Sequence, residues 1–176
     1  MTFIRFLIVV FFVSNSIFAR GYDVFGIGYY DVKFDGSSTN QATYFRYERR
    51  FDKVLVDIGP EEDNYFYLKP FAGIEATSKS SYYILGGIYL EDNLGQLFIG
   101  DRSNFIFIPS FGAGYYDGGN GNKLGSKIEF RTAFEISYEM QNKNRIGLSF
   151  SHISNSNISN TNPGVEIISL SYQIPY

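Results

Sequence analysis

The segment IEFRTAFEISYE, residues 128–139, decides the fold of this chain. Its side chains alternate in character along the segment. One parity holds Ile128, Phe130, Thr132, Phe134, Ile136 and Tyr138, and the other holds Glu129, Arg131, Glu135 and Glu139. Successive side chains of a strand point to opposite faces, so this pattern predicts a β-strand with one apolar face and one charged face.

The same alternation recurs from residue 22 onward and is interrupted by polar turn signals. These signals are DGSSTN at 35–40, GPEEDN at 59–64, SKSS at 78–81, EDNLG at 91–95, DGGNGNKLG at 117–125, QNKN at 141–144 and the Ser- and Asn-rich stretch 155–164. They predict strands at 22–34, 41–58, 65–76, 81–90, 104–116, 126–139, 145–154 and 165–176. Residues 91–103 fit the pattern least, and a short helix or a loop is expected there.

Eight alternating strands can form a soluble barrel or a membrane barrel, and the two differ in where the apolar face points. Strands of about 10–13 residues suit a tilted bilayer crossing better than globular strands of about 5–6 residues. The charges of both signs at 128–139 suit a small polar interior, and the last strand ends in an aromatic residue, Tyr176. We therefore predict an all-β fold, an eight-stranded antiparallel transmembrane β-barrel of the outer membrane.

The even strand number predicts that both termini lie on one side, the periplasm. The loops 35–40, 78–81, 117–125 and 155–164 would then face outside, and the periplasmic turns are expected to be short. The structural alternative is a soluble periplasmic barrel whose apolar face lines a ligand cavity. Extraction without detergent would identify such a protein.

The composition excludes several kinds of site. The 176 residues include no cysteine and one histidine, which excludes disulfides, thiolate metal sites and a three-histidine zinc site. The net charge of -3 and the lack of a Lys/Arg block argue against nucleic acid as a partner. Aromatic residues make up 19% of the chain, which argues against disorder.

Residues 1–19, MTFIRFLIVVFFVSNSIFA, have the three-part layout of a secretory signal. Arg5 gives a positive start, an apolar run follows from Phe6 to Val13, and Ala19 offers a small residue for cleavage. The alternative, a transmembrane anchor, needs about 20 apolar residues, and this run is much shorter. We predict an exported chain with a single barrel domain at residues 20–176.

The sole histidine lies on the apolar parity of its predicted strand, RIGLSFSHIS at 145–154. His152 and Ser154 continue the row of Ile146, Leu148 and Phe150. Glu166 likewise continues the apolar parity of the last strand. Because these strands form a hairpin, His152 and Glu166 are expected to lie opposite or diagonal, about 5–8 Å apart between Cβ atoms. Ionisable groups at the membrane are costly unless they are paired and functional.

A row of Ser, His and Glu suits nucleophilic acyl transfer. Ser154 would attack, His152 would take its proton, and Glu166 would fix the imidazole tautomer. Neither a metal ion nor another cofactor is required. Each residue alone has a simpler interpretation, because a single polar residue near a strand end is commonly interfacial. The candidate donors to the oxyanion are Asn155, Asn162 and the backbone amide of Gly164.

The stretch HISNSNISNTNPGVE, residues 152–166, resembles the carboxy-terminal motif of the lipid A 3-O-deacylases called PagL, which pairs H-x-S-N with N-x-G-x-E. The matching residues are His152, Ser154, Asn155, Asn162, Gly164 and Glu166. Elsewhere the chain is similar to that family only in strand length, alternation and number. The resemblance implies an outer-membrane esterase of a Gram-negative bacterium, which removes the 3-hydroxyacyl chain at position 3 of lipid A. It also implies that Ser154 is the nucleophile, His152 its base and Glu166 the third member.

The implied partner is lipopolysaccharide in the outer leaflet of the membrane. Its acyl chain would lie along an apolar surface made by Leu148, Phe150, Ile168 and Leu170. Loop 155–164 has no basic residue for the lipid phosphates, which leaves Lys79, Lys123 and Arg102 as candidates. The rival function is a non-enzymatic surface barrel for adhesion or structural integrity, suggested by the glycine-rich loop 117–125. The sequence leaves the choice between a monomer and a homodimer open.

Overall fold

The computed structural model describes residues 21–33, 40–58 and 67–176. Its eight long strands are β1 (Tyr22–Tyr30), β2 (Ala42–Arg50), β4 (Tyr67–Thr77), β5 (Tyr82–Tyr89), β7 (Phe105–Asp117), β8 (Ile128–Glu139), β9 (Arg145–Ser154) and β10 (Val165–Pro175). The other described elements are β3 (Val56–Asp57), β6 (Asp92–Asn93) and the helix α1 (Leu94–Ile99).

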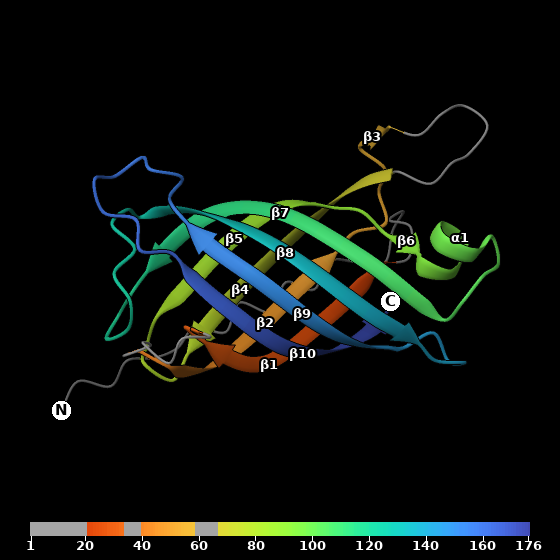
Figure 1. Cartoon of the computed structure of the whole chain (residues 1–176), viewed down its shortest axis with the longest axis horizontal. Coiled ribbons are helices and arrows are strands. Elements are labelled where there is room, and N and C mark those ends of the chain that lie inside the picture. The colour runs from red at the N-terminus through yellow and green to blue at the C-terminus, as the bar shows by residue number, and fades with distance from the viewer. Residues whose placement is uncertain (1–20, 34–39, 59–66) are drawn as a thin grey trace.

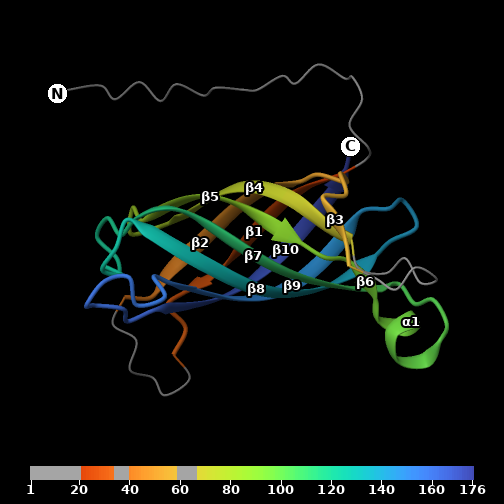
Figure 2. The same cartoon turned by 90° about the horizontal axis from the view of Figure 1, so that it is seen from above.

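The long strands close into an antiparallel barrel. They pair in the order β2-β1-β10-β9-β8-β7-β5-β4, and β2 pairs with β4 to complete the ring. The short strands β3 and β6 pair with β4 and β7. Figures 1 and 2 show the long strands running obliquely to the long axis of the molecule. The predicted eight-stranded antiparallel barrel is confirmed.

The alternation in the sequence corresponds to the two faces of the barrel wall. In β8 the buried side chains include Glu129, Arg131 and Glu135, and the exposed ones include Phe134, Ile136 and Tyr138. Strands β9 and β10 show the same period of two in their burial. In these strands the outer face is apolar and the inner face carries the charges, which is the arrangement of a membrane barrel and the reverse of a soluble one. A cluster of buried aromatic and aliphatic side chains, including Tyr44, Tyr83 and Ile153, shares the interior with the charges.

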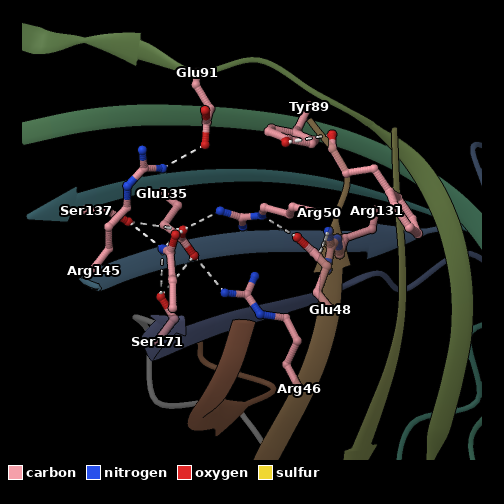
Figure 3. Close-up of polar contacts among 12 residues, drawn as sticks. Arg46, Glu48, Arg50, Tyr89, Glu91, Arg131, Glu135, Ser137, Arg145 and Ser171 are labelled. Carbon is pink, nitrogen blue, oxygen red and sulfur yellow. Dashed lines mark hydrogen bonds and ion pairs between the residues drawn. The ribbon is translucent and has the colours of Figure 1, made fainter. Parts of the chain in front are cut away.

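Six charged side chains meet inside the barrel, and none of them is more than 5% exposed. They are Arg46, Arg50, Arg131, Glu48, Glu75 and Glu135. Glu135 accepts hydrogen bonds from Arg46 Nη2 at 2.7 Å and from Arg50 Nη1 at 2.9 Å. Figure 3 shows Glu135 between these two arginines, with Glu48 beside Arg50. The three positive and three negative charges cancel, so these buried side chains form a paired network.

A second cluster of ion pairs lies where β9 begins. Arg145 Nη1 binds Glu91 Oε1 at 2.7 Å, Arg145 Nη2 binds Glu139 at 3.1 Å, and Lys69 lies 3.6 Å from Glu91. Burial alone would raise the pKa of the Glu91 carboxyl, but the charges of Arg145 and Lys69 hold it below its ordinary value. Ion pairs therefore also line this end of the barrel, around a cavity to which Lys69, Glu91 and Arg145 contribute.

Two predicted strands extend at least four residues beyond the end of the observed ones. The first was expected to reach residue 34, but β1 ends at Tyr30, because Asp31 adopts a left-handed φ of 61° that a strand does not continue. The second was expected to reach residue 58, but β2 ends at Arg50. The alternation fails after it, since Asp52 and Lys53 are adjacent polar residues and three apolar residues follow. The chain returns to the sheet there only as β3.

Residues 91–103 contain the short helix that was one of the two expectations. Asn93 caps α1 by accepting a hydrogen bond from the Gln96 amide at 3.2 Å. Gly100, with a φ of 81°, ends the helix in the left-handed conformation typical of C-caps.

The connections β4–β5, β7–β8 and β9–β10 lie at one end of the barrel, and the carboxy terminus lies at the other with α1 (Figure 1). The expectation of short turns at the carboxy-terminal end is wrong for two connections. The β2–β4 connection carries β3, and the β5–β7 connection carries β6 and α1.

The predicted signal segment, residues 1–19, lies outside the described residues. The single-domain assignment of residues 20–176 stays a prediction. Within the described ranges, no helix has the length and apolar character needed to cross a bilayer.

Candidate active site

His152 and Glu166 lie directly opposite each other on the outward face of the β9–β10 hairpin. The strand register pairs them, and His152 Nδ1 lies 3.1 Å from Glu166 Oε1. Their side chains are 44% and 32% exposed, so neither is enclosed by the barrel. The sequence predicted this pair from parity alone, and the register makes it a directly opposed pair.

Ser154 lies on the same outward row, two residues beyond His152 and opposite Phe130 of β8. Both side chains are described, and no hydrogen bond joins the Ser154 hydroxyl to the imidazole. Catalytic hydrogen bonds are often long before substrate binds, so the geometry is compatible with a serine nucleophile and a histidine base. The structure brings His152 and Glu166 into contact and places Ser154 beside them.

Gly164 packs directly against the imidazole. A Cβ atom at this position would lie 2.6 Å from His152 Cε1 and 3.3 Å from Nε2. Gly164 also has a φ of 63°, which side-chain-bearing residues seldom adopt. Only glycine therefore fits both the backbone conformation and the space beside the ring.

The Asn155 side chain is placed differently from its expected role. It is fully buried, and its Nδ2 donates to the Leu124 carbonyl at 2.7 Å and to the Thr161 carbonyl at 2.8 Å. Both amide protons are thus engaged inside the barrel mouth, away from the Ser154 row. Asn155 directly follows β9, whose odd-numbered residues are buried, and it continues that inward parity. Its role as a donor to the oxyanion stays a prediction.

Asn162 lies on the other side of the same loop. Its Oδ1 accepts from the Asn155 backbone amide at 3.0 Å, and its Nδ2 donates to Asn157 Oδ1 at 3.1 Å. Because Asn157 is exposed, a bound substrate could take over that Nδ2 donor. Asn162 and Gly164 therefore stay candidate donors.

Sequence reasoning missed the contribution of the β7–β8 loop to this site. The Leu124 carbonyl holds Asn155, and Gly125 packs so closely on the Thr161 carbonyl that a Cβ would lie 1.9 Å from its oxygen. Gly125 has a φ of 96°, which suits a turn. The sequence could therefore predict a turn at this glycine, but not its contact with another loop. The two loops support each other at the mouth of the barrel.

The predicted acyl-chain surface is a continuous outward strip below His152 and Glu166. The register pairs Phe150 with Ile168 and Leu148 with Leu170. Leu148 is 57% exposed and Leu170 58% exposed. The strip therefore offers an apolar path that begins at the polar pair.

The three candidate phosphate-binding residues are not all near this strip. Lys79 and Lys123 lie in loops at the same end of the barrel as Ser154. Arg102 follows α1 and lies near Phe105, which pairs with Tyr138 at the opposite end of β8. Arg102 is therefore wrong as a phosphate-binding candidate, because the length of the barrel separates it from His152.

Comparisons with known proteins agree with the fold and the motif. A lipid A deacylase PagL of Bordetella bronchiseptica is 38% identical over 50 residues, which make up 28% of this chain and 28% of that relative. A crystal structure of the outer membrane enzyme PagL superposes with a TM-score of 0.64 at 16% identity, covering 88% of this chain and 99% of that one. A de novo designed transmembrane β-barrel gives a TM-score of 0.57 at 9% identity, over 89% of this chain and 95% of the design.

The match to a protein family extends over most of the barrel. Residues 28–175, from β1 to the end of β10, match the family described as lipid A 3-O-deacylase (PagL). The chain belongs to the lipid A 3-O-deacylase (PagL) family.

Proposed function

We propose that this protein is an outer-membrane esterase that hydrolyses the 3-O-linked 3-hydroxyacyl chain of lipid A. Ser154, His152 and Glu166 form its triad on the lipid-facing surface of the barrel. The observation that carries the proposal is the 3.1 Å contact between His152 Nδ1 and Glu166 Oε1 on the outward face. Family membership supports the substrate class.

The contact with Glu166 determines how His152 acts. A carboxylate that accepts from Nδ1 keeps the proton there and leaves Nε2 as the base. Nε2 takes the proton of Ser154 as Oγ attacks the ester carbonyl. The tetrahedral intermediate then collapses, and its C–O bond to the sugar breaks while His152 returns the proton to the departing sugar hydroxyl.

A water molecule completes the cycle. His152 takes a proton from the water, the hydroxide attacks the acyl carbonyl, and the 3-hydroxy fatty acid leaves as Ser154 regains its proton. Asn162 Nδ2 and the Gly164 amide are the proposed donors to the oxyanion in both steps. Asn155 supports them indirectly. Its backbone amide donates to Asn162, and its side chain donates to the Leu124 carbonyl, so it holds the loop in place.

The position of the triad fits a substrate embedded in the membrane. The scissile ester of lipid A lies near the boundary between sugar and hydrocarbon. The acyl chain would run down the strip that contains Leu148, Phe150, Ile168 and Leu170. Substrate would therefore be held beside the barrel, since buried charged, aromatic and aliphatic side chains occupy the interior.

The test is the lipid A of cells that express the chain and of cells that carry an empty vector. We expect mass spectra of the expressing cells to show lipid A lighter by one 3-hydroxyacyl chain, with the free fatty acid in the extract. Identical lipid A in both strains, with the barrel present and folded in the outer membrane, would instead support an adhesion or structural barrel.

Glu166→Ala is expected to lower kcat by about 10²–10⁴-fold, less than removal of the nucleophile, because an orienting group contributes less than the groups it orients. Purified enzyme with lipid A in detergent gives the rate. Glu166→Gln is the informative companion, since it keeps the size of the side chain and removes its charge. Wild-type rates in both variants would remove Glu166 from the mechanism.

Gly164→Ala is expected to lower kcat by about a hundredfold, because a Cβ there forces the imidazole to shift by a sizeable fraction of an ångström. The matched control is Gly100→Ala, which has a similar positive φ of 81° and nothing within 4 Å of the added Cβ. The Gly100→Ala variant therefore has the backbone strain of a positive φ but no contact with the imidazole. Equal losses in the two variants would mean that strain, and not the position of His152, explains the effect.

A further inference from the structure

The connection between β5 and β7 presents three large apolar side chains to the outside. Leu97 is 47% exposed, and Phe98 and Ile99 are each 78% exposed. Within the described part of the chain, no other large apolar side chain is as exposed as Phe98 and Ile99. Leu97, Phe98 and Ile99 are the last three residues of α1, which Figures 1 and 2 both show outside the barrel wall.

The strand register sets the level of α1 along the barrel. Asp92 and Asn93 pair with Phe107 and Ile106, so the helix begins beside the first residues of β7. The ring of Phe105 lies 5.4 Å from the ring of Tyr138, and such aromatic residues mark the edge of an apolar band. From Phe105 to Tyr115 the outward positions of β7 span a tilted height of about 25 Å, the usual height of that band. The helix therefore lies at the edge of the lipid-covered surface.

The exposed side chains are held by a rigid base. Asn93 Nδ2 donates to the Ser103 carbonyl at 2.7 Å, and the Ser103 amide donates to Asn93 Oδ1 at 2.9 Å. The Gly95 amide donates to Ser103 Oγ at 3.0 Å. These bonds close the excursion at its two ends, so the apolar tip is presented by an ordered structure.

We propose that Leu97, Phe98 and Ile99 insert into the interfacial layer of the phospholipid leaflet on the carboxy-terminal side of the barrel. An apolar cluster this exposed is unfavourable in water, and here it belongs to a helix that begins beside the first residues of β7, at the edge of the apolar outer wall. The exposed Asp101 and Arg102 follow the tip directly and would lie among the headgroups. The helix would thereby fix the depth of the barrel. This inference needs a membrane barrel but not the chemistry of Ser154.

The absence of tryptophan from the sequence makes a direct test available, because any introduced tryptophan is the sole reporter. Phe98→Trp places it at the tip of the excursion. Gln141→Trp is the aqueous control, in the exposed turn between β8 and β9, and Leu148→Trp is the hydrocarbon control on the outer wall. Each purified protein is folded into phosphatidylcholine vesicles that carry bromine either near the headgroup or deep in the acyl chains, in both leaflets.

We expect the emission of the Phe98→Trp protein to be blue-shifted and quenched more strongly by shallow bromine than by deep bromine. The Leu148→Trp protein should show the opposite order, and the Gln141→Trp protein should be quenched by neither. Two results would overturn the proposal. One is an emission like that of the Gln141→Trp protein, which would place the tip in water. The other is a blue-shifted emission that no bromine quenches, which would mean that protein, such as a second copy of the chain, covers the tip. Folding of each variant is checked by the shift in gel migration that heating causes. If the Phe98→Trp protein does not fold, Ile99→Trp is tested in its place.

Discussion

Ser154→Ala should lower release of the 3-hydroxy fatty acid by at least about 10⁴-fold while the barrel folds as the wild type does. Removal of the nucleophile leaves no atom to carry the acyl group, and only substrate binding and the oxyanion donors still favour attack by water. The outward, partly exposed position of Ser154 means that the substitution disturbs no buried contact. The measurement is the mass spectrum of lipid A from cells that express each form at equal levels.

The matched control for this prediction is Ser151→Ala on the same strand. Ser151 is 3% exposed and points into the barrel, whereas Ser154 points outward. The control should leave lipid A as fully deacylated as the wild type does. Unchanged loss of the acyl chain in the Ser154→Ala strain would contradict the assignment of Ser154, even with the family membership intact.

Parity explains why so much of the site could be predicted from the sequence. A strand has a side-chain period of two, so the face of His152 and Glu166 follows from their neighbours in sequence. Antiparallel hairpin pairing then limits their separation before any coordinates are known. The sequence predicted an opposed or diagonal pair, and the register selected the opposed one.

Contacts between loops could not be predicted in the same way. Asn155 belongs to a sequence motif, but its side-chain partners are carbonyls of Leu124 and Thr161. Leu124 lies on another loop, 31 residues earlier in the chain. No periodic pattern links such positions, since irregular loops have no fixed side-chain direction. Parity therefore predicts that Asn155 points inward, but it does not predict the carbonyls to which its side chain donates.

The interior network illustrates the same limit. Alternation in β8 predicted charged side chains inside the barrel, including Arg131 and Glu135. It could not predict that Arg131 would pair with residues of β2 and β4, because those contacts run across the lumen and join residues 83 and 56 positions apart. Closure of the ring determines these partners.

The largest effect on stability is expected from Arg131→Met. Arg131 is fully buried and binds Glu48 Oε2 at 2.7 Å through Nη2 and Glu75 Oε1 through Nη1. Glu48 keeps its bond to Arg50 after the substitution, but Glu75 loses the one ion-pair partner it has among the described residues. A buried carboxylate left without its cation destabilises a protein by about 3–5 kcal/mol. Guanidinium unfolding in detergent micelles, followed by far-ultraviolet circular dichroism, measures the change.

Two companion variants separate the effect of the unpaired Glu75 carboxylate on stability from the effect of the other lost contacts. Arg131→Met combined with Glu75→Gln removes the uncompensated carboxylate and should recover a substantial part of the lost stability. Lys127→Met breaks an ion pair of similar length, 2.6 Å to Asp117, but Lys127 is 59% exposed, and its unfolding midpoint should not change measurably. If Arg131→Met unfolds at the same midpoint as Lys127→Met, the interior charges do not hold the barrel together. Its stability would then have to come from the wall alone, through strand pairing and the apolar outer face.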